Sequence, residues 1–264
     1  MKKWKEESLE QVNLEIIDGD RGDNYPKSHE FTKEGYCLFL NTSNIKNDSF
    51  NLSDINFIDE KKDSMLRKGK LQRNDIVITT RGTIGSIAYY HDSIPYDQIR
   101  INSGMVIIRS QSNVDSKYLY LAFRSNYFKE QCFKRSSGSA QPQLPIKDLK
   151  TIKIPLPPLP TQQRIAAILS SYDDLIENNR RRITLLEDSA RLLYKEWFVK
   201  FQFPGHEKVK VKNGLPVGWE RRKIGDIAET VGGGTPSTVV PEYWNEGNIT
   251  WFVPKDLTNN GCLP

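Results

Sequence analysis

The sequence predicts an α+β protein in three parts: a globular mixed domain, a long coiled-coil helix, and the incomplete start of a second globular domain. Three observations predict this arrangement. Short β-rich runs and helical patterns share the first part, a proline-rich stretch leads into a heptad pattern of about forty residues, and the last part repeats segments from the chain's beginning. We place the three parts at 1–158, 159–203 and 204–264.

The composition of the 264 residues excludes several classes of protein. Hydrophobic residues make up 37% of the chain and charged residues 27%, which is typical of a soluble globular protein. The chain has no apolar run close to the roughly 20 residues that span a bilayer, and "MKKWKEESLE" lacks the apolar region of a secretory signal. Its three cysteines and three histidines are scattered, so we expect no metal site. We expect a cytoplasmic protein that does not associate with membranes.

The net charge of +5 is distributed unevenly along the chain. Residues 61–73 contain six basic residues and one acid, and residues 124–135 contain four basic residues and one acid. The second of these segments also contains Tyr127, Phe128 and Phe133. Basic segments with interleaved aromatic residues suit a nucleic-acid backbone, although solvated charge on an ordinary surface explains them equally well.

The first part contains several clear element signals. Residues 75–90, "DIVITTRGTIGSIAYY", are two β-rich runs around a glycine-flanked turn, which predicts a hairpin, and 104–110 predicts another strand. Residues 115–135 show helical spacing of apolar residues, with Asp115 or Ser116 as the N-cap. A stretch without helical character, "SSGSAQPQ", follows this helix, and a short turn and a strand then lead to the prolines.

The second part has the period of a coiled coil. Steps that alternate between four and three residues connect a heptad seam of apolar side chains, interrupted by one central Asn. An ordinary amphipathic helix packed on its own domain is the alternative, but such a helix is usually shorter and has a wider apolar face. We expect the helix to run from an N-cap at Thr161 to Phe201, where "FPGH" follows. The heptad seam consists of Ile165, Leu169, Tyr172, Ile176, Asn179, Ile183, Leu186, Ala190, Leu193 and Trp197.

The prolines in "PLPPLP" (155–160) restrict the backbone just before the helix. We therefore expect them to fix the angle between the first domain and the helix. Beyond the helix, residues 219–231 resemble residues 4–16, and residues 247–257 resemble residues 35–45. Two matched segments in the same order indicate a duplicated domain, whose second copy has too little chain for a core of its own.

These features resemble the specificity subunit of Type I restriction-modification enzymes, in a truncated or half-subunit form. The resemblance is carried by "RGTIG", "SGSAQPQL", the segment "IKIPLPPLPTQQRIAAILSSYDDLIENNRRRITLLE", and the segment that begins "LPVGWERRKIGDIAETVGGGTPS". It implies a DNA target-recognition domain followed by a spacer helix. It also implies double-stranded DNA, methyltransferase subunits and translocase or nuclease subunits as partners. The partner subunits would bind S-adenosylmethionine, ATP and Mg, and this chain would bind no cofactor.

The residues themselves predict a non-catalytic chain. The glycine run at 232–234 lacks the spacing of a dinucleotide-binding or methyl-donor loop, and no Asn-Pro-Pro-Tyr segment is present for a flipped base. A stand-alone coiled-coil DNA-binding protein such as a repressor remains an alternative function. The basic segments disfavour a third class, an adaptor that binds only protein.

Two predicted loops offer candidate DNA contacts. Arg81 and Thr83 lie at the hairpin tip, whose glycines allow a phosphate to approach the backbone closely, although a plain turn is an equal alternative. The polar loop after the basic helix contains side chains that can bond phosphate or adenine, and a polar connector is its alternative interpretation. The candidates in this loop are Ser136, Ser139, Gln141 and Gln143.

The resemblance implies where base-reading residues belong. Members recognise different sequences, so segments typical of the family should not read bases. Base readers are then expected in 19–28, 41–48 and 95–103, and the candidates there are Arg21, Tyr25, Lys27, Asn44 and Arg100.

The heptad seam also predicts an association. The resemblance implies that a distal helix of the same subunit covers this seam. Because no such helix follows here, we expect a second copy of this chain to cover the seam in antiparallel orientation.

Overall fold

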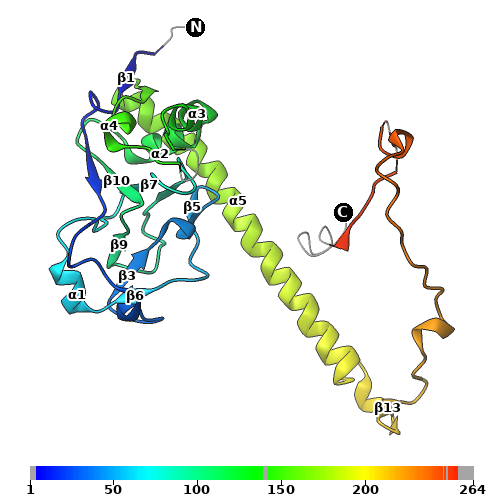
Figure 1. Cartoon of the computed structure of the whole chain (residues 1–264). Coiled ribbons are helices and arrows are strands. Elements are labelled where there is room, and N and C mark those ends of the chain that lie inside the picture. Colours follow the sequence, from blue (N-terminus) through cyan, green and yellow to red (C-terminus); the bar gives the residue numbers. More distant parts are fainter. Residues whose placement is uncertain (1–3, 139–141, 246, 248, 255–264) are drawn as a thin grey trace. The chain divides into compact units, whose positions relative to one another are not determined.

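The computed structural model describes residues 4–138, 142–245, 247 and 249–254 (Figure 1). The chain divides into two compact units, Met1–Leu186 and Glu187–Pro264. The first unit is a mixed α+β domain with the long helix at its C-terminal end, as predicted. Its strands are β1 (Glu6–Ser8), β2 (Leu14–Asp18), β3 (Cys37–Leu40), β4 (Ile45–Lys46), β5 (Ser49–Phe50), β6 (Phe57–Ile58), β7 (Ile76–Thr79), β8 (Ile87–Tyr89), β9 (Ile99–Ile101), β10 (Met105–Ser110) and β11 (Lys153–Pro155). Its helices are α1 (Glu60–Met65), α2 (Ser116–Arg124), α3 (Asn126–Lys134) and α4 (Ile146–Leu149), and α5 (Leu159–Tyr194) begins in this unit and ends in the second.

Two sheets form the body of this unit. The larger sheet is antiparallel, with strand order β2-β10-β7-β8. The smaller sheet has the order β6-β3-β9, and β3 and β9 are parallel although 58 residues separate Leu40 from Ile99 in the chain. A separate pair joins β1 to β11. Figure 1 shows α2, α3 and α4 beside β1, and α1 with β6 at the opposite end of the unit.

The core has two parts on opposite faces of the larger sheet. Because successive side chains of a strand point to opposite faces, Val106 and Ile108 of β10 join the cluster that contains α2 and α3, while Met105 and Ile107 join the cluster of the smaller sheet. Strands β7 and β8 alternate in the same way. The buried central strands read as continuous apolar runs because both of their faces are covered.

The structure confirms several predicted elements and corrects one. The hairpin of 75–90 is β7 paired with β8, the strand of 104–110 is β10, and the Asp115 side chain caps α2 by accepting from the Tyr118 amide. The predicted single helix over 115–135 is wrong, since it is divided into α2 and α3. Ser125 ends one helix and begins the next, because its backbone is extended while its side chain accepts from the Phe128 amide.

Helix α5 begins at Leu159 and places Pro160 in its first turn, so the predicted N-cap at Thr161 is wrong by three residues. A π-helical turn at Lys195–Val199 follows α5, and Gly205 then adopts a left-handed backbone with φ of 86°. Three of the prolines before α5 have different environments. Pro155 lies in β11 opposite Glu6 of β1, Pro157 is buried, and Pro158 is exposed.

The second unit contains a short hairpin of β12 (Val211–Lys212) and β13 (Leu215–Pro216). Near it, Trp219 makes aromatic contacts with Phe198, Phe201 and Phe203 at centroid distances of 5.8, 5.5 and 5.6 Å. The repeat predicted at 219–231 stays a prediction: these residues form a 3-10 turn at Ile224–Asp226, and the matched segment 247–257 lies partly outside the described residues. Among the described residues, no helix is long and apolar enough to cross a membrane.

Candidate nucleic-acid interface

The turn at 102–104, between β9 and β10, is where several predicted contact segments meet. The Gly104 carbonyl accepts hydrogen bonds from the Thr80 amide at 2.8 Å, the Arg81 amide at 3.2 Å and the Thr80 hydroxyl at 3.0 Å. The Asn102 side chain accepts from the Gly104 amide at 2.9 Å. A Cβ atom on Gly104 would lie 2.9 Å from Cγ2 of Thr42, so the turn packs tightly against the 41–44 segment. We call this turn, together with the residues that contact it (Thr42, Thr80 and Arg81), the 102–104 junction.

The hairpin tip of 81–85 lies at one side of the 102–104 junction. Gly82 and Gly85 have φ values of 71° and 76°, which glycine adopts without strain. The Thr79 hydroxyl donates to the Thr83 carbonyl within the tip. The Arg81 side chain is partly exposed and Thr83 is exposed, so both are accessible as predicted.

The polar loop after α3 joins the hairpin tip through the backbone. Arg81 and Ser137 each form an isolated β-bridge with Gln143, and the Leu144 amide donates to the Thr80 carbonyl at 2.9 Å. Gln143 is exposed at this position. The Ser136 hydroxyl donates to the Phe133 carbonyl at 2.7 Å, which gives it a local structural partner. The candidates Ser139 and Gln141 lie outside the described residues.

The 19–28 segment reaches the same junction from another side. The Arg21 guanidinium donates to the Ser103 carbonyl at 3.2 Å and pairs with Asp18 at 3.1 Å, yet its side chain remains 52% exposed. Tyr25 is half-buried and packs edge-on against Phe39 at 5.7 Å. Burial raises the pKa of Tyr25 although hydrogen bonds to Ser103 oppose the rise. Tyr25 therefore contributes to packing as well as to the surface.

Lys27 is exposed, and its amide donates to the Glu30 carboxylate at 2.7 Å where a 3-10 turn begins at Ser28–Glu30. This contact uses the backbone of Lys27 and leaves its charged side chain at the surface.

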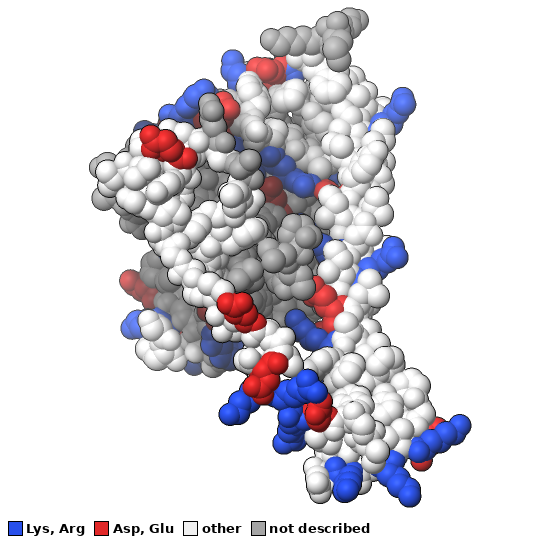
Figure 2. Space-filling model, turned by 90° about the vertical axis from the view of Figure 1, so that its right-hand side faces the viewer, with Lys and Arg blue, Asp and Glu red and all other residues white. Residues whose placement is uncertain are grey.

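Figure 2 shows one face of the molecule, on which Lys and Arg stand singly or beside Asp and Glu. On that face, the described part of the chain therefore presents mixed charge.

The structure buries two of the predicted base readers, Asn44 and Arg100, which does not favour a direct contact of either side chain with DNA. Asn44 is 2% exposed, and its amide group donates to the Asn51 and Asp54 carbonyls at 3.0 and 2.8 Å. Arg100 is 5% exposed and forms an ion pair with Asp63 at 2.5 Å. Their donors are used within the protein.

The sequence interpretation missed two polar residues of the 102–104 junction, Thr42 and Asn102. Both are partly exposed, and Thr42 contacts Gly104 while Asn102 holds its amide. The stretch "NSG" at 102–104 is a turn signal of small and polar residues between two apolar strands. That signal marks the turn, and only the folded structure shows which segments pack around it.

The long helix exposes most of its heptad seam. Ile165 is half-buried and, with Leu169, lines an apolar groove of about 350 Å³ beside Tyr118, Leu121 and Ile154. Along the rest of the seam Trp197 is half-buried in the π-helical turn, and Asn179 and Ala190 are exposed. Five larger seam residues are also exposed: Tyr172 by 61%, Ile176 by 48%, Ile183 by 56%, Leu186 by 67% and Leu193 by 50%.

Exposed apolar residues also lie outside the heptad seam. Ile168 and Leu175 are seven residues apart, and Leu185 and Leu192 repeat that spacing. The apolar surface is therefore wider than a two-position seam. An apolar face of this width exceeds a strict coiled-coil seam and is the feature that the alternative interpretation, an amphipathic helix, predicts.

Comparison with known proteins gives a family match over most of the chain. The family model described as the Type I restriction modification DNA specificity domain matches residues 1–188. The Type I restriction enzyme MjaIX specificity subunit of Methanocaldococcus jannaschii is 33% identical over 196 residues, which are 72% of this chain and 44% of that protein. The HindI specificity subunit of Haemophilus influenzae is 26% identical over 209 residues, which are 76% of this chain and 42% of that protein.

Solved structures show the same fold. The crystal structure of the S subunit of a Type I restriction-modification system from M. genitalium aligns with a TM-score of 0.54 and 18% identity, over 74% of this chain and 46% of that one. A structure concerned with complex assembly of the type I R-M system aligns with a TM-score of 0.50 and 21% identity, over 72% of this chain and 43% of that one. The chain thus spans less than half the length of these relatives.

Proposed function

This chain belongs to the family of the Type I restriction modification DNA specificity domain, and from that premise we propose that it reads one half-site of a DNA target for a Type I restriction-modification complex. The observation that carries the proposal is the 102–104 junction. Four segments that are distant in the chain present partly or fully exposed polar side chains there: Arg21, Thr42, Arg81 and Gln143. Loops held by a rigid sheet are the usual place for recognition residues.

The contacts at the 102–104 junction divide into two kinds. Arg81 and Thr83 lie on a tip with two left-handed glycines, which suits the close approach of a phosphate. Arg21 lies in a segment that is not typical of the family, and its guanidinium carries forked donors that suit a base edge, since Arg pairs with guanine. Thr42 and Asn102 are further short polar groups at the same place. Positioning and reading are thus supplied by neighbouring side chains.

The exposed helix supports a second role, the docking of partner subunits. We propose that the apolar surface of α5 binds methyltransferase subunits of the same system and a second helix along the heptad seam. Ile168 and Leu192 are exposed outside the heptad seam, so they are accessible to a neighbour other than the second helix. A second copy of this chain, packed antiparallel, would place two identical reading domains about a two-fold axis, and such a dimer would read an inverted repeat.

In this proposal the chain is non-catalytic. Methyl transfer and cleavage, with S-adenosylmethionine, ATP and Mg, belong to the methyltransferase and the translocase or nuclease subunits. In the part of the chain that the structure describes, no three His, Cys, Asp or Glu side chains form a group that could hold a metal ion. A stand-alone repressor is not favoured, because the family match and the relatives are specificity domains and subunits.

The proposal is tested by co-expressing the full chain with the methyltransferase subunits of its own system. We expect co-purification and methylation of one defined sequence motif, which is mapped by sequencing. Arg81→Ala should weaken binding about equally for all sequences, whereas Arg21→Ala should relax the motif. Lys153→Ala on β11 is the matched control, since this exposed residue lies on the strand paired with β1. Absence of both co-purification and DNA binding would refute the proposal.

A further inference from the structure

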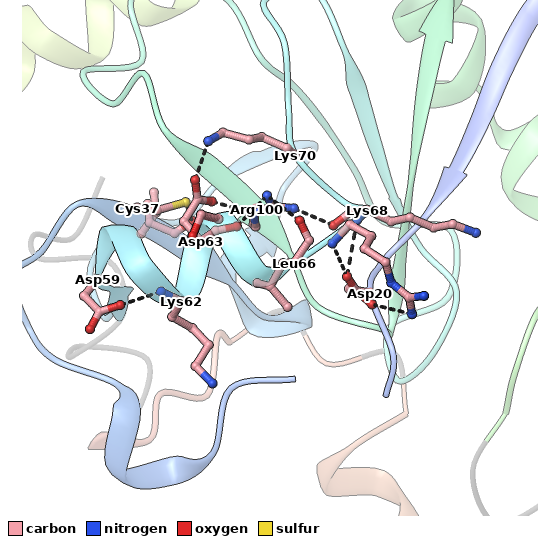
Figure 3. A network of polar contacts seen from close by, with 12 residues as sticks. Asp20, Cys37, Asp59, Lys62, Asp63, Leu66, Lys68, Lys70 and Arg100 are labelled. Atoms are coloured by element: carbon pink, nitrogen blue, oxygen red, sulfur yellow. Dashed lines mark hydrogen bonds and ion pairs between the residues drawn. The ribbon is translucent and has the colours of Figure 1, made fainter. Parts of the chain in front are cut away.

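We infer that residues 66–70 form a phosphate-binding loop next to the 102–104 junction, in which Arg67 and Lys68 contact the DNA backbone. This inference rests on the proposed function and adds a site to it. The loop follows α1 and reads "LRKGK". Its peptide groups are held by a network of buried polar side chains, shown in Figure 3, so that its cationic side chains remain at the surface.

Asp20 holds the loop through backbone amides. Its carboxylate is 8% exposed and accepts from the amides of Arg67, Lys68 at 3.3 Å and Arg21 at 2.7 Å. Burial alone would raise the pKa of Asp20, but these amide hydrogen bonds outweigh it and hold the pKa below its ordinary value. The Arg67 guanidinium approaches Asp20 only to 3.9 Å, so backbone groups satisfy most of this carboxylate.

Arg100 and Asp63 hold the loop from the side of the core. The Arg100 guanidinium donates to the Lys68 carbonyl at 2.7 Å, the Leu66 carbonyl at 3.0 Å and the Asp63 carbonyl at 2.9 Å. It also donates to the Asp63 carboxylate at 2.5 Å, and the same carboxylate accepts from Lys70 at 2.5 Å. Asp63 therefore pairs with both Arg100, which is buried, and Lys70, whose side chain is 37% exposed.

Two glycines bring the loop against the 102–104 junction. Gly69 has a φ of 82°, and a Cβ atom there would lie 3.3 Å from Cα of Gly19. A Cβ atom on Gly19 would lie 2.1 Å from the Asn102 carbonyl oxygen. The Ile101 amide also donates to the Gly69 carbonyl at 2.9 Å. The loop and the reading segments are thus packed backbone to backbone.

The cations of this loop that are exposed are Arg67 and Lys68, whereas Lys70 is partly exposed and paired with Asp63. The Arg67 side chain is 79% exposed and lies near Gly22, where a Cβ atom would be 3.9 Å from its Nη2 atom. Lys68 is exposed and points away from the buried network in Figure 3. The acidic side chain of Asp18 is already paired with Arg21. Because the loop backbone is already ordered, binding a phosphate there costs little conformational entropy.

The test is a salt titration of DNA affinity for the full chain in complex with its methyltransferase partner. Each phosphate contact steepens the plot of log K against log salt by about 0.9. We expect Arg67→Ala and Lys68→Ala each to reduce the slope by about 1, and the double variant by about 2. Lys153→Ala removes an exposed charge on β11 and should leave the slope unchanged. Arg67 and Lys68 are exposed, so these variants should keep the fold.

The outcomes separate this inference from the function on which it rests. If the wild-type complex binds and Arg81→Ala weakens it, but the Arg67 and Lys68 variants keep the wild-type slope, the phosphate-binding loop is refuted alone. An equal change of slope in Lys153→Ala would also refute it, because the effect would then be one of net charge. No DNA binding by the wild-type complex would refute the proposed function itself.

Discussion

Gln162 provides the sharpest test of how the long helix is attached to the first domain. Its side chain is 1% exposed in the first turn of α5. Its amide nitrogen donates to the Pro157 carbonyl at 2.8 Å, and its oxygen accepts from the Asp115 amide at 3.0 Å. The residue thus joins the proline-rich stretch, the start of α2 and the start of α5. Gln163, its neighbour, is exposed and serves as a matched control.

Gln162→Ala should remove the side-chain partner of two backbone groups, the Pro157 carbonyl and the Asp115 amide. An unsatisfied buried donor or acceptor costs about 1–3 kcal/mol. Pro157 is buried, whereas Asp115 is partly exposed and can regain a water, so we expect a total loss of about 2–4 kcal/mol. For a unit of this size, that corresponds to a fall in melting temperature of about 5–15 °C.

The assay is calorimetric unfolding of the full-length variants, combined with amide hydrogen exchange. In Gln162→Ala the Asp115 amide should exchange faster, because it has lost its acceptor, and the first transition should move to lower temperature. Gln163→Ala should change the free energy of unfolding by no more than about 0.5 kcal/mol, and it should leave the exchange rate of the Asp115 amide unchanged. Equal shifts for the two variants would refute the reasoning, since helix propensity alone would then explain them.

Three further predictions follow from the structure. The exposed heptad seam should make the isolated chain self-associate at micromolar concentration, which light scattering can measure. Asn179→Leu should strengthen this association but make the register of the two paired helices less specific. A monomer at that concentration would contradict the role of the heptad seam. Removing one heptad from 165–193 should shorten the helix by about 10 Å and the spacer of the recognised motif by about three base pairs, as methylation mapping would show. Because the pKa of Asp20 is lowered in the folded state, the contribution of Asp20 to stability should be complete above its unfolded pKa of about 3.8 and be lost as the pH falls below that value. The difference in unfolding free energy between wild type and Asp20→Asn, measured by denaturant titration, should therefore shrink below pH 3.8. A difference that stays constant with pH would contradict this prediction.

The elements that were predictable from sequence are those with strong local signals. The hairpin β7–β8 has two β-rich runs around "RGTIG", and α5 has a heptad pattern over several turns. The break at Ser125 was not predictable from periodicity, because apolar residues keep a helical spacing through α2 and α3. A single side-chain cap decides that break, with Ser125 accepting from the Phe128 amide.

The candidate site was predictable by segment but not by residue. Residues 19–28, 41–48 and 95–103 were expected to read DNA, and the structure places parts of all three around the 102–104 junction. Arg100 and Asn44 could not be distinguished from surface residues, because their partners are set by the tertiary fold. Asp63 is 37 residues from Arg100 in the chain, and the carbonyls of Asn51 and Asp54 follow Asn44 only after a turn.

The polar residues of these segments therefore have two separable roles. Asn44, Asp20 and Arg100 are buried and hold loops, while Arg21, Gln143 and the 66–70 loop present side chains at the surface. Replacing a buried member leaves a charge or amide unpaired, which destabilises the domain whatever DNA it reads. Replacing an exposed member changes contacts and leaves the loops in place. A change of recognised sequence in this fold is thus achieved with least loss of stability by substituting exposed residues within each segment while its buried polar partners are kept.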